Sequence, residues 1–169
     1  MCHSRNRLMV LCLLFCLSMI SLQAGAVPRT LTDYIKTRCT THCVDPDLLL
    51  FSVTEAGRQY DLNPRVLLAI IDTESGFRTN ATNSRKGKSV GLMQIQVFWH
   101  RDKFHSKNPY DVLANVSVGA QIYRDCVDKW KRSREKALWC YNGHQRNKGK
   151  PYNEKINRSY SQIIQLELS

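Results

Sequence analysis

The sequence lacks internal repeats, low-complexity tracts and linkers rich in proline or glycine. Alternating apolar and polar residues, the pattern that indicates strands, are scarce. After the first 26 residues, no segment is apolar enough to cross a bilayer. These absences argue against a repeat protein, a sheet-based fold and a chain with several membrane spans. They predict one mainly helical domain, which suits a length of 169 residues.

The beginning of the chain has the three-part layout of a secretory signal peptide. Arg5 and Arg7 precede an apolar run over Leu8–Ile20, and a small-x-small cleavage site ends at Ala26. A retained membrane anchor is the alternative, but the run is short for a spanning helix. Cleavage leaves a single domain over residues 27–169 without a stable membrane span, and it predicts a periplasmic or secreted protein.

Four cysteines remain after the leader is removed. An even number in an exported chain suggests disulfides, and four cysteines allow three pairings. We favour Cys39–Cys43 and Cys126–Cys140, of which the second closes a loop of about 15 residues and stabilises by roughly 3 kcal/mol. A zinc site is the alternative, disfavoured because no paired Cys-x-x-Cys spacing is present and no two histidines have ligand spacing on one helix. We therefore expect no metal or cofactor.

The net charge of the chain is +11, or +9 once Arg5 and Arg7 are removed with the leader. A basic surface favours anionic partners such as nucleic acid, phospholipid headgroups or an acidic wall polymer. Export favours the wall or the membrane and argues against nucleic acid. A solvated basic face that only aids solubility is the alternative.

Helix starts are marked by capping residues followed by apolar residues at helical spacing. Asp45-Pro46 and Asn63-Pro64 each combine an N-cap with proline at the first helical position, and Asp111 can cap a long helix. We expect loops over residues 77–90 and 142–153. The predicted helices run from 46 to about 57, 64 to about 76, 91 to 98, 111 to about 130, 135 to 141 and 156 to 166.

One carboxylate stands out, at the end of the second predicted helix. Glu74 lies seven residues after Leu67, four after Ile70 and three after Ile71, so it continues the apolar stripe. Burial and the negative end of the helix dipole should both raise its pKa. A carboxyl group protonated near neutral pH suits a general acid. Asp72, on the opposite side of the helix, is expected to be solvated. The alternative to a catalytic role for Glu74 is a Glu at a helix end that bonds a nearby backbone amide or basic group.

The sequence around Glu74 resembles the soluble lytic transglycosylases of the goose-type lysozyme superfamily. The motifs occur in the family's order and cover roughly residues 45–165; it also resembles the small members associated with secretion systems or conjugative pili. The resemblance implies an all-α, lysozyme-like fold. The motifs are Thr73-Glu74-Ser75-Gly76-Phe77, Asn83-Ser84, Gly91-Leu92-Met93-Gln94, Asn115, Gly119-Ala120, Tyr141-Asn142-Gly143 and Tyr160.

The resemblance implies that Glu74 is the sole acid/base in cleavage of peptidoglycan between N-acetylmuramic acid and N-acetylglucosamine, with a 1,6-anhydro product. Tyr141 is expected to bond or orient Glu74. The chain departs from the family at Cys140, where a small residue is usual. The resemblance implies substrate contacts at Ser75, Ser84, Gly91, Met93, Gln94, Tyr141, Asn142 and Tyr160.

Several alternatives stay open. The Ser75 hydroxyl can bond back into its helix instead of holding the sugar, and Met93 can fill a core gap instead of forming a cleft wall. The same fold could support a lysozyme-type hydrolase, which a well-placed second acid in the cleft would favour, or a glycan-binding assembly protein without turnover. The cellular role implied by the resemblance is local opening of the wall for a secretion or pilus system.

Overall fold

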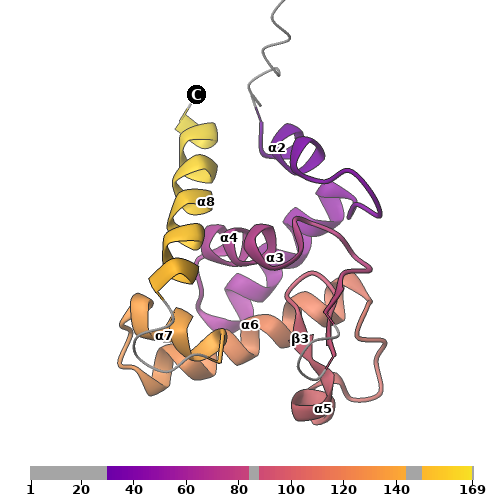
Figure 1. Cartoon of the computed structure of the whole chain (residues 1–169), viewed down its shortest axis with the longest axis vertical. Helices are drawn as coiled ribbons and strands as arrows, with labels where there is room; N and C mark the ends of the chain where they lie inside the picture. Colours follow the sequence, from indigo (N-terminus) through magenta and orange to yellow (C-terminus); the bar gives the residue numbers. More distant parts are fainter. Residues whose placement is uncertain (1–29, 84–87, 144–149, 169) are drawn as a thin grey trace, which may run out of the picture.

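The computed structural model describes residues 30–83, 88–143 and 150–168, with side chains described to residue 166. The predicted leader and Ser84 lie outside the described residues. The fold is mainly helical, with one small sheet (Figure 1). Its elements are α2 (Leu31–Arg38), α3 (Pro46–Tyr60), α4 (Pro64–Ser75), β1 (Thr82–Asn83), β2 (Ser89–Val90), β3 (Ile95–Gln96), α5 (Val97–His100), η1 (Arg101–Phe104), α6 (Val112–Lys129), α7 (Arg134–Tyr141) and α8 (Lys150–Leu168).

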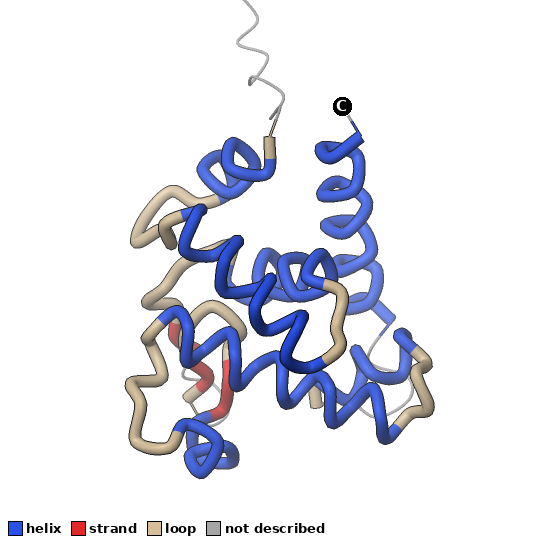
Figure 2. Tube along the Cα trace, turned by 180° about the vertical axis from the view of Figure 1, so that it is seen from behind, coloured by secondary structure: helices blue, strands red, loops and turns tan. Residues whose placement is uncertain are grey.

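Helix α4 is the central helix of the domain. Its residues from Val66 to Asp72 are all buried, because α8 packs along one side of it and α3 along another. Helix α6 in turn supports α3 and α7, and in Figure 2 it crosses beneath α3. The small sheet and α5 lie at the far end of the molecule from α8 (Figure 1). Because α4 is buried between its neighbours, the position and direction of its last turn, which carries Glu74, are fixed.

The three predicted N-caps are present. Asp45 accepts a hydrogen bond from the amide of Leu48, and Asp111 accepts one from Ala114. Asn63 accepts from the amide of Arg65, and proline follows both Asp45 and Asn63 in the first turn. These side chains satisfy amides that have no partner within the helix. Short-range chemistry therefore places the starts of α3, α4 and α6 where the sequence predicts them.

Gly57 does not end α3, contrary to our expectation. The helix continues to Tyr60 and ends at Asp61, which adopts a left-handed conformation with φ of 50°. Gly57 instead permits close packing, since a Cβ there would lie 2.8 Å from Cγ of Pro64. The glycine serves the contact between α3 and the start of α4.

The predicted helix over residues 91–98 is also wrong. Residues 91–94 form turns, Ile95 and Gln96 pair with β2 as β3, and only Val97–His100 are helical. Gly91 and Gln94 have positive φ angles of 75° and 48°, which interrupt a right-handed helix. The apolar content of this segment reflects burial in the core and not helical periodicity.

Two further predictions need correction at the ends of the domain. Helix α2 was not predicted, and it buries Asp72, which we expected to be solvated: the carboxylate accepts hydrogen bonds from the Tyr34 hydroxyl at 2.8 Å and Nε of Arg38 at 2.9 Å. Helix α8 begins at Lys150 and not at Ile156, so the loop expected over residues 142–153 is shorter. The burial of Asp72 arises from packing between residues distant in the sequence, whereas the earlier start of α8 has a local mark in Pro151.

Candidate active site

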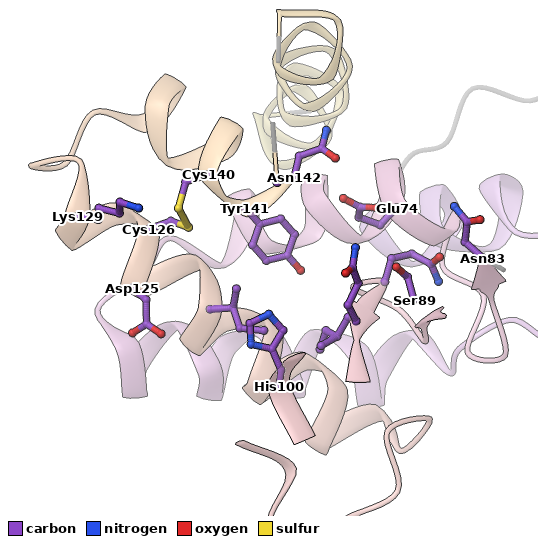
Figure 3. Close-up of a pocket in the computed structure, with 15 residues that line it drawn as sticks. Glu74, Asn83, Ser89, His100, Asp125, Cys126, Lys129, Cys140, Tyr141 and Asn142 are labelled. Carbon is purple, nitrogen blue, oxygen red and sulfur yellow. A yellow bond between two sulfur atoms is a disulfide. The ribbon is translucent and has the colours of Figure 1, made fainter. Parts of the chain in front are cut away.

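A cleft of about 630 Å³ opens beside the end of α4. The sheet, α5, α6 and the end of α7 form the rest of its wall (Figure 3). Asp125 and Lys129 lie toward one end of the cleft and Asn83 toward the other, with Tyr141 and then Glu74 between them. The lining residues are Glu74, Asn83, Ser89, Gln94, Ile95, Gln96, His100, Ile122, Asp125, Cys126, Lys129, Cys140, Tyr141, Asn142 and Gly143.

Glu74 occupies the last turn of α4, which Gly76 ends in a left-handed conformation. Burial raises the pKa of the Glu74 carboxyl from 4.5 to about 7, and this effect exceeds the opposing influence of the Tyr152 hydrogen bond and the charge of Lys155. The direction agrees with the prediction from the apolar stripe. A carboxyl group with this pKa is partly protonated at neutral pH and can both give and take a proton.

The hydroxyl that donates to Glu74 belongs to Tyr152. Its oxygen lies 2.7 Å from Oε1 of Glu74. Sequence reasoning missed this residue because it fell in the expected loop over residues 142–153. Pro151 was an available signal, since proline is favoured in the first turn of a helix, and a helix that starts near Lys150 places Tyr152 against α4.

Tyr141 contacts a different acceptor from the one we expected. Its hydroxyl donates to the carbonyl oxygen of Met93 at 2.8 Å and not to the Glu74 carboxylate. Its ring nevertheless projects into the cleft in which Glu74 lies (Figure 3). Burial raises the pKa of both Tyr141 and Tyr152 well above the ordinary tyrosine value, so both hydroxyls keep their protons at neutral pH.

The turn from Gly91 to Gln94 is held by the buried side chain of Asn115. The Asn115 amide donates to the carbonyls of Val90 and Pro109, and its oxygen accepts from the amide of Met93 at 2.8 Å. A Cβ at Gly91 would lie 2.3 Å from the Asn115 side chain, so the close approach requires glycine. The sequence motif contained Asn115, but its role as the anchor of this turn required the structure.

The predicted side chains of the Met93 turn divide between the core and the cleft. Met93 is fully buried, with its sulfur packed against Gly119, which is the core-packing alternative. Gln94 lines the cleft, and its Nε2 donates to the carbonyls of Ala81 and Gly91, both at 3.0 Å. Ser75 is buried, and its hydroxyl bonds back to the carbonyl of Ile71 at 3.0 Å.

Of the predicted contacts Asn142 and Tyr160, the structure places one in the cleft and one outside it. Asn142 caps α7 and lines the cleft. Tyr160 does not line it: its hydroxyl accepts from the side chain of Asn63 at 3.4 Å, and the guanidinium of Arg134 lies 4.3 Å from the centre of its ring. Tyr160 therefore packs where α8 meets other helices, away from Glu74.

Both favoured disulfides are present. Cys39–Cys43 joins the end of α2 to the segment before α3, and Cys126–Cys140 joins α6 to α7. The second bond lines the cleft and the first does not. The departure from the family pattern at Cys140 is thus part of the cleft wall.

Polar residues at the far end of the cleft were not predicted. Asp125 is paired with Lys103 at 3.1 Å, and Lys129 follows one helical turn later. Burial, followed by the charge of Lys103, lowers the pKa of His100. The carboxylates of Glu74 and Asp125, which both line the cleft, therefore have different surroundings: the first is half-buried beside a tyrosine, and the second is exposed and ion-paired.

Within residues 30–83, 88–143 and 150–168, no group of three or more His, Cys, Asp or Glu side chains is placed to hold a metal ion. Over the same residues, no helix has the length and apolar character that a membrane span requires.

Comparison with known proteins agrees with this architecture. The chain is 28% identical over 108 residues to a protein of Shigella sonnei (strain Ss046) called membrane-bound lytic murein transglycosylase C. The match covers 54% of this chain and 30% of the relative, so the chain spans less than a third of that protein. The family described as the transglycosylase SLT domain matches residues 51–164, more than half of the chain. The protein, with its all-α, lysozyme-like fold, therefore belongs to the transglycosylase SLT domain family.

Proposed function

We propose that this protein is a peptidoglycan lytic transglycosylase that cleaves the β-1,4 bond between N-acetylmuramic acid and N-acetylglucosamine. The observation that supports this most directly is Glu74: a carboxyl group in a cleft, with its pKa raised to about 7 by burial. At neutral pH such a group is available both as an acid and, after proton transfer, as a base. Membership of the SLT family supports the same substrate class.

In the proposed reaction, the protonated Glu74 gives its proton to the glycosidic oxygen as the bond from that oxygen to C1 breaks. The 6-hydroxyl oxygen of the muramoyl residue then closes onto C1, and its proton passes to the Glu74 carboxylate. The product has a 1,6-anhydro end, and Glu74 returns to its starting state. The reaction uses one carboxylate in turn as acid and base, unlike the usual scheme with two.

The surrounding groups fit this single-carboxylate scheme. The Tyr152 hydroxyl at 2.7 Å fixes one oxygen of Glu74 and stabilises its ionised form between the two proton transfers. Gln94 and Asn142 line the cleft and are suited to bond the N-acetyl and hydroxyl groups of the sugars. We propose Ser84 as an additional contact, on the strength of the Asn83-Ser84 motif in the sequence.

A hydrolase that uses water in place of the 6-hydroxyl is the closest alternative. It would benefit from a second carboxylate next to the reacting carbon. Asp125, the other carboxylate of the cleft, is paired with Lys103 at 3.1 Å and lies on the far side of Tyr141 from Glu74 (Figure 3). This placement favours the transglycosylase.

The test is mass spectrometry of the products formed from purified peptidoglycan. The wild-type protein and Glu55→Gln should release anhydro-ended muropeptides, and Glu74→Gln should not. Glu55 is a suitable control because it lies on α3 in an exposed ion pair with Arg58. Reducing-ended fragments would establish the hydrolase instead. Folded wild-type protein that released neither product would point to a glycan-binding assembly protein.

We further propose that the protein is exported, that residues 27–169 form its mature domain, and that it opens the wall locally for a secretion or pilus system. The leader pattern and the small size of the domain support this role. Cell fractionation should recover a chain that begins after Ala26 outside the cytoplasm. If deletion of the gene left secretion, conjugation and pilus assembly unchanged, the proposed cellular role would be wrong.

A further inference from the structure

The cleft wall between Glu74 and Lys129 includes a disulfide bond. Cys126 of α6 and Cys140 of α7 both line the cleft, and their disulfide lies beside Tyr141 (Figure 3). The next three residues along the chain, Tyr141 to Gly143, line the cleft as well. The disulfide therefore joins α6 directly to the segment that forms this wall.

Helix α7 needs external support. It has eight residues, and Ala137 and Leu138 are the only two of them that are buried. Isolated helices shorter than about 12 residues are marginal in water, so tertiary contacts must fix the position of such a helix. Its bond to α6 lies at the last turn, immediately before Tyr141, where a shift would be passed directly to the cleft.

Tyr141 transmits the position of α7 to the opposite wall. Its ring packs edge-on against Tyr123 of α6, with centroids 6.0 Å apart, and its hydroxyl bonds the carbonyl of Met93. These contacts link the position of the end of α7 to the positions of α6 and of the Met93 turn. Displacement of α7 would change the width of the cleft on the side where the sugars must bind.

Glu74 is held mainly by elements other than α7, although α8 also contacts α7 through the Asn153 side chain, which donates to the carbonyl of Glu135. It belongs to α4, and its hydrogen-bond donor Tyr152 belongs to α8. Movement of the α7 wall should therefore alter the placement of substrate more than the proton affinity of Glu74, whose hydrogen-bond donor stays on α8. This difference separates a positioning role from a general loss of structure.

We propose that the Cys126–Cys140 disulfide positions the Tyr141 wall of the cleft, so that the enzyme is fully active only when these two cysteines are oxidised to the disulfide. This inference rests on the proposed function for its activity readout. A dithiol such as dithiothreitol would reverse the state: the S–S bond breaks, the two cysteines each gain a proton and an electron, and dithiothreitol is oxidised to its cyclic disulfide. The disulfide thus restricts wall cleavage to an oxidising compartment.

The first test compares two matched variants, Cys126→Ala/Cys140→Ala and Cys39→Ala/Cys43→Ala, below the unfolding temperature of each. The cleft variant should lose roughly tenfold or more in kcat/KM, because a misplacement of about 1 Å in an active site can cost about 100-fold. The midpoint of its pH profile should stay near that of the wild type. The control variant should keep its kcat/KM.

Coupling to Tyr141 is tested by adding Tyr141→Phe to the cleft variant. If the disulfide acts through this side chain, the fold-loss in kcat/KM of the combined variant will be smaller than the product of the fold-losses of Tyr141→Phe and of the cleft variant. Dithiothreitol should inhibit the wild type and the control variant but not the cleft variant. Equal activity of both disulfide variants, or inhibition of the cleft variant by dithiothreitol, would overturn the inference.

Amide hydrogen exchange keeps the two proposals distinguishable. In the cleft variant, amides over residues 134–142 should exchange faster than in the wild type, and those over 64–75 should not. If the wild type shows no activity, the proposed function fails while this measurement still tests the role of the disulfide. Unchanged exchange over 134–142 would show that the disulfide does not position α7.

Discussion

Replacing Tyr152 with phenylalanine tests the origin of the Glu74 acidity. The change removes the hydroxyl that donates to Oε1 of Glu74 at 2.7 Å and keeps the buried ring. This hydrogen bond lowers the pKa of Glu74, whereas burial raises it to about 7. Loss of the hydroxyl leaves the effect of burial less opposed, so the pKa of Glu74 should rise further.

The size of the rise follows from the strength of the bond. A hydrogen bond to a charged group contributes about 1.5–3 kcal/mol, and one pKa unit corresponds to about 1.4 kcal/mol. The protonated carboxyl also loses part of its interaction with the hydroxyl, which reduces the net effect. We therefore expect a rise of roughly one unit.

The assay is the pH dependence of kcat/KM. Because the first step requires protonated Glu74, activity falls as the pH rises through its pKa, and in Tyr152→Phe this fall should occur roughly one unit higher. Tyr160→Phe is the control on the same helix, since the Tyr160 hydroxyl contacts Asn63 and does not line the cleft. An unchanged or lower midpoint in Tyr152→Phe would refute the reasoning.

Three other changes test the surroundings of the site. Folding raises the pKa of Glu74 from 4.5 to about 7, so the folded chain binds a proton more tightly than the unfolded chain, and the free energy of unfolding falls as the pH rises through this range. Glu74→Gln removes this effect. It should therefore be more stable than the wild type by up to roughly 3 kcal/mol at pH 8 and by little at pH 4, measured by urea unfolding. Gly91→Ala should destabilise by about 1–3 kcal/mol in thermal unfolding, since its φ is 75° and its Cβ would meet Asn115 at 2.3 Å; stability equal to the wild type would contradict this close approach. Asp72→Ala should cost about 1–3 kcal/mol by removing an acceptor of the Tyr34 hydroxyl, with product release per folded molecule unchanged; a loss of turnover would instead place Asp72 in the catalytic arrangement.

Features determined by neighbours in the sequence could be predicted. The caps at Asp45, Asn63 and Asp111 located three helices, because each side chain bonds an amide two or three residues later. The spacing of Glu74 from Ile70 and Ile71 likewise predicted a raised pKa. Both inferences required only the geometry of a single helix.

Features determined by distant residues could not be predicted in the same way. The turn at Gly91 depends on Asn115, which lies 24 positions later, and Tyr152 reaches Glu74 from 78 positions away. The burial of Asp72 depends on α2, whose Tyr34 and Arg38 supply the donors. A periodic apolar pattern indicates which face of a helix is buried but not which polar group meets it.

The packing of α8 against α4 has a consequence for the newly made protein. Without α8, the Glu74 carboxyl lacks its Tyr152 donor and the part of its burial that α8 supplies. A nascent chain that ends before Tyr152 should thus hold Glu74 in different surroundings from the complete domain, even with α4 already formed. Truncation before Tyr152 should therefore alter the Glu74 carboxyl without altering α4 itself, which separates formation of the helix that carries the group from formation of its surroundings.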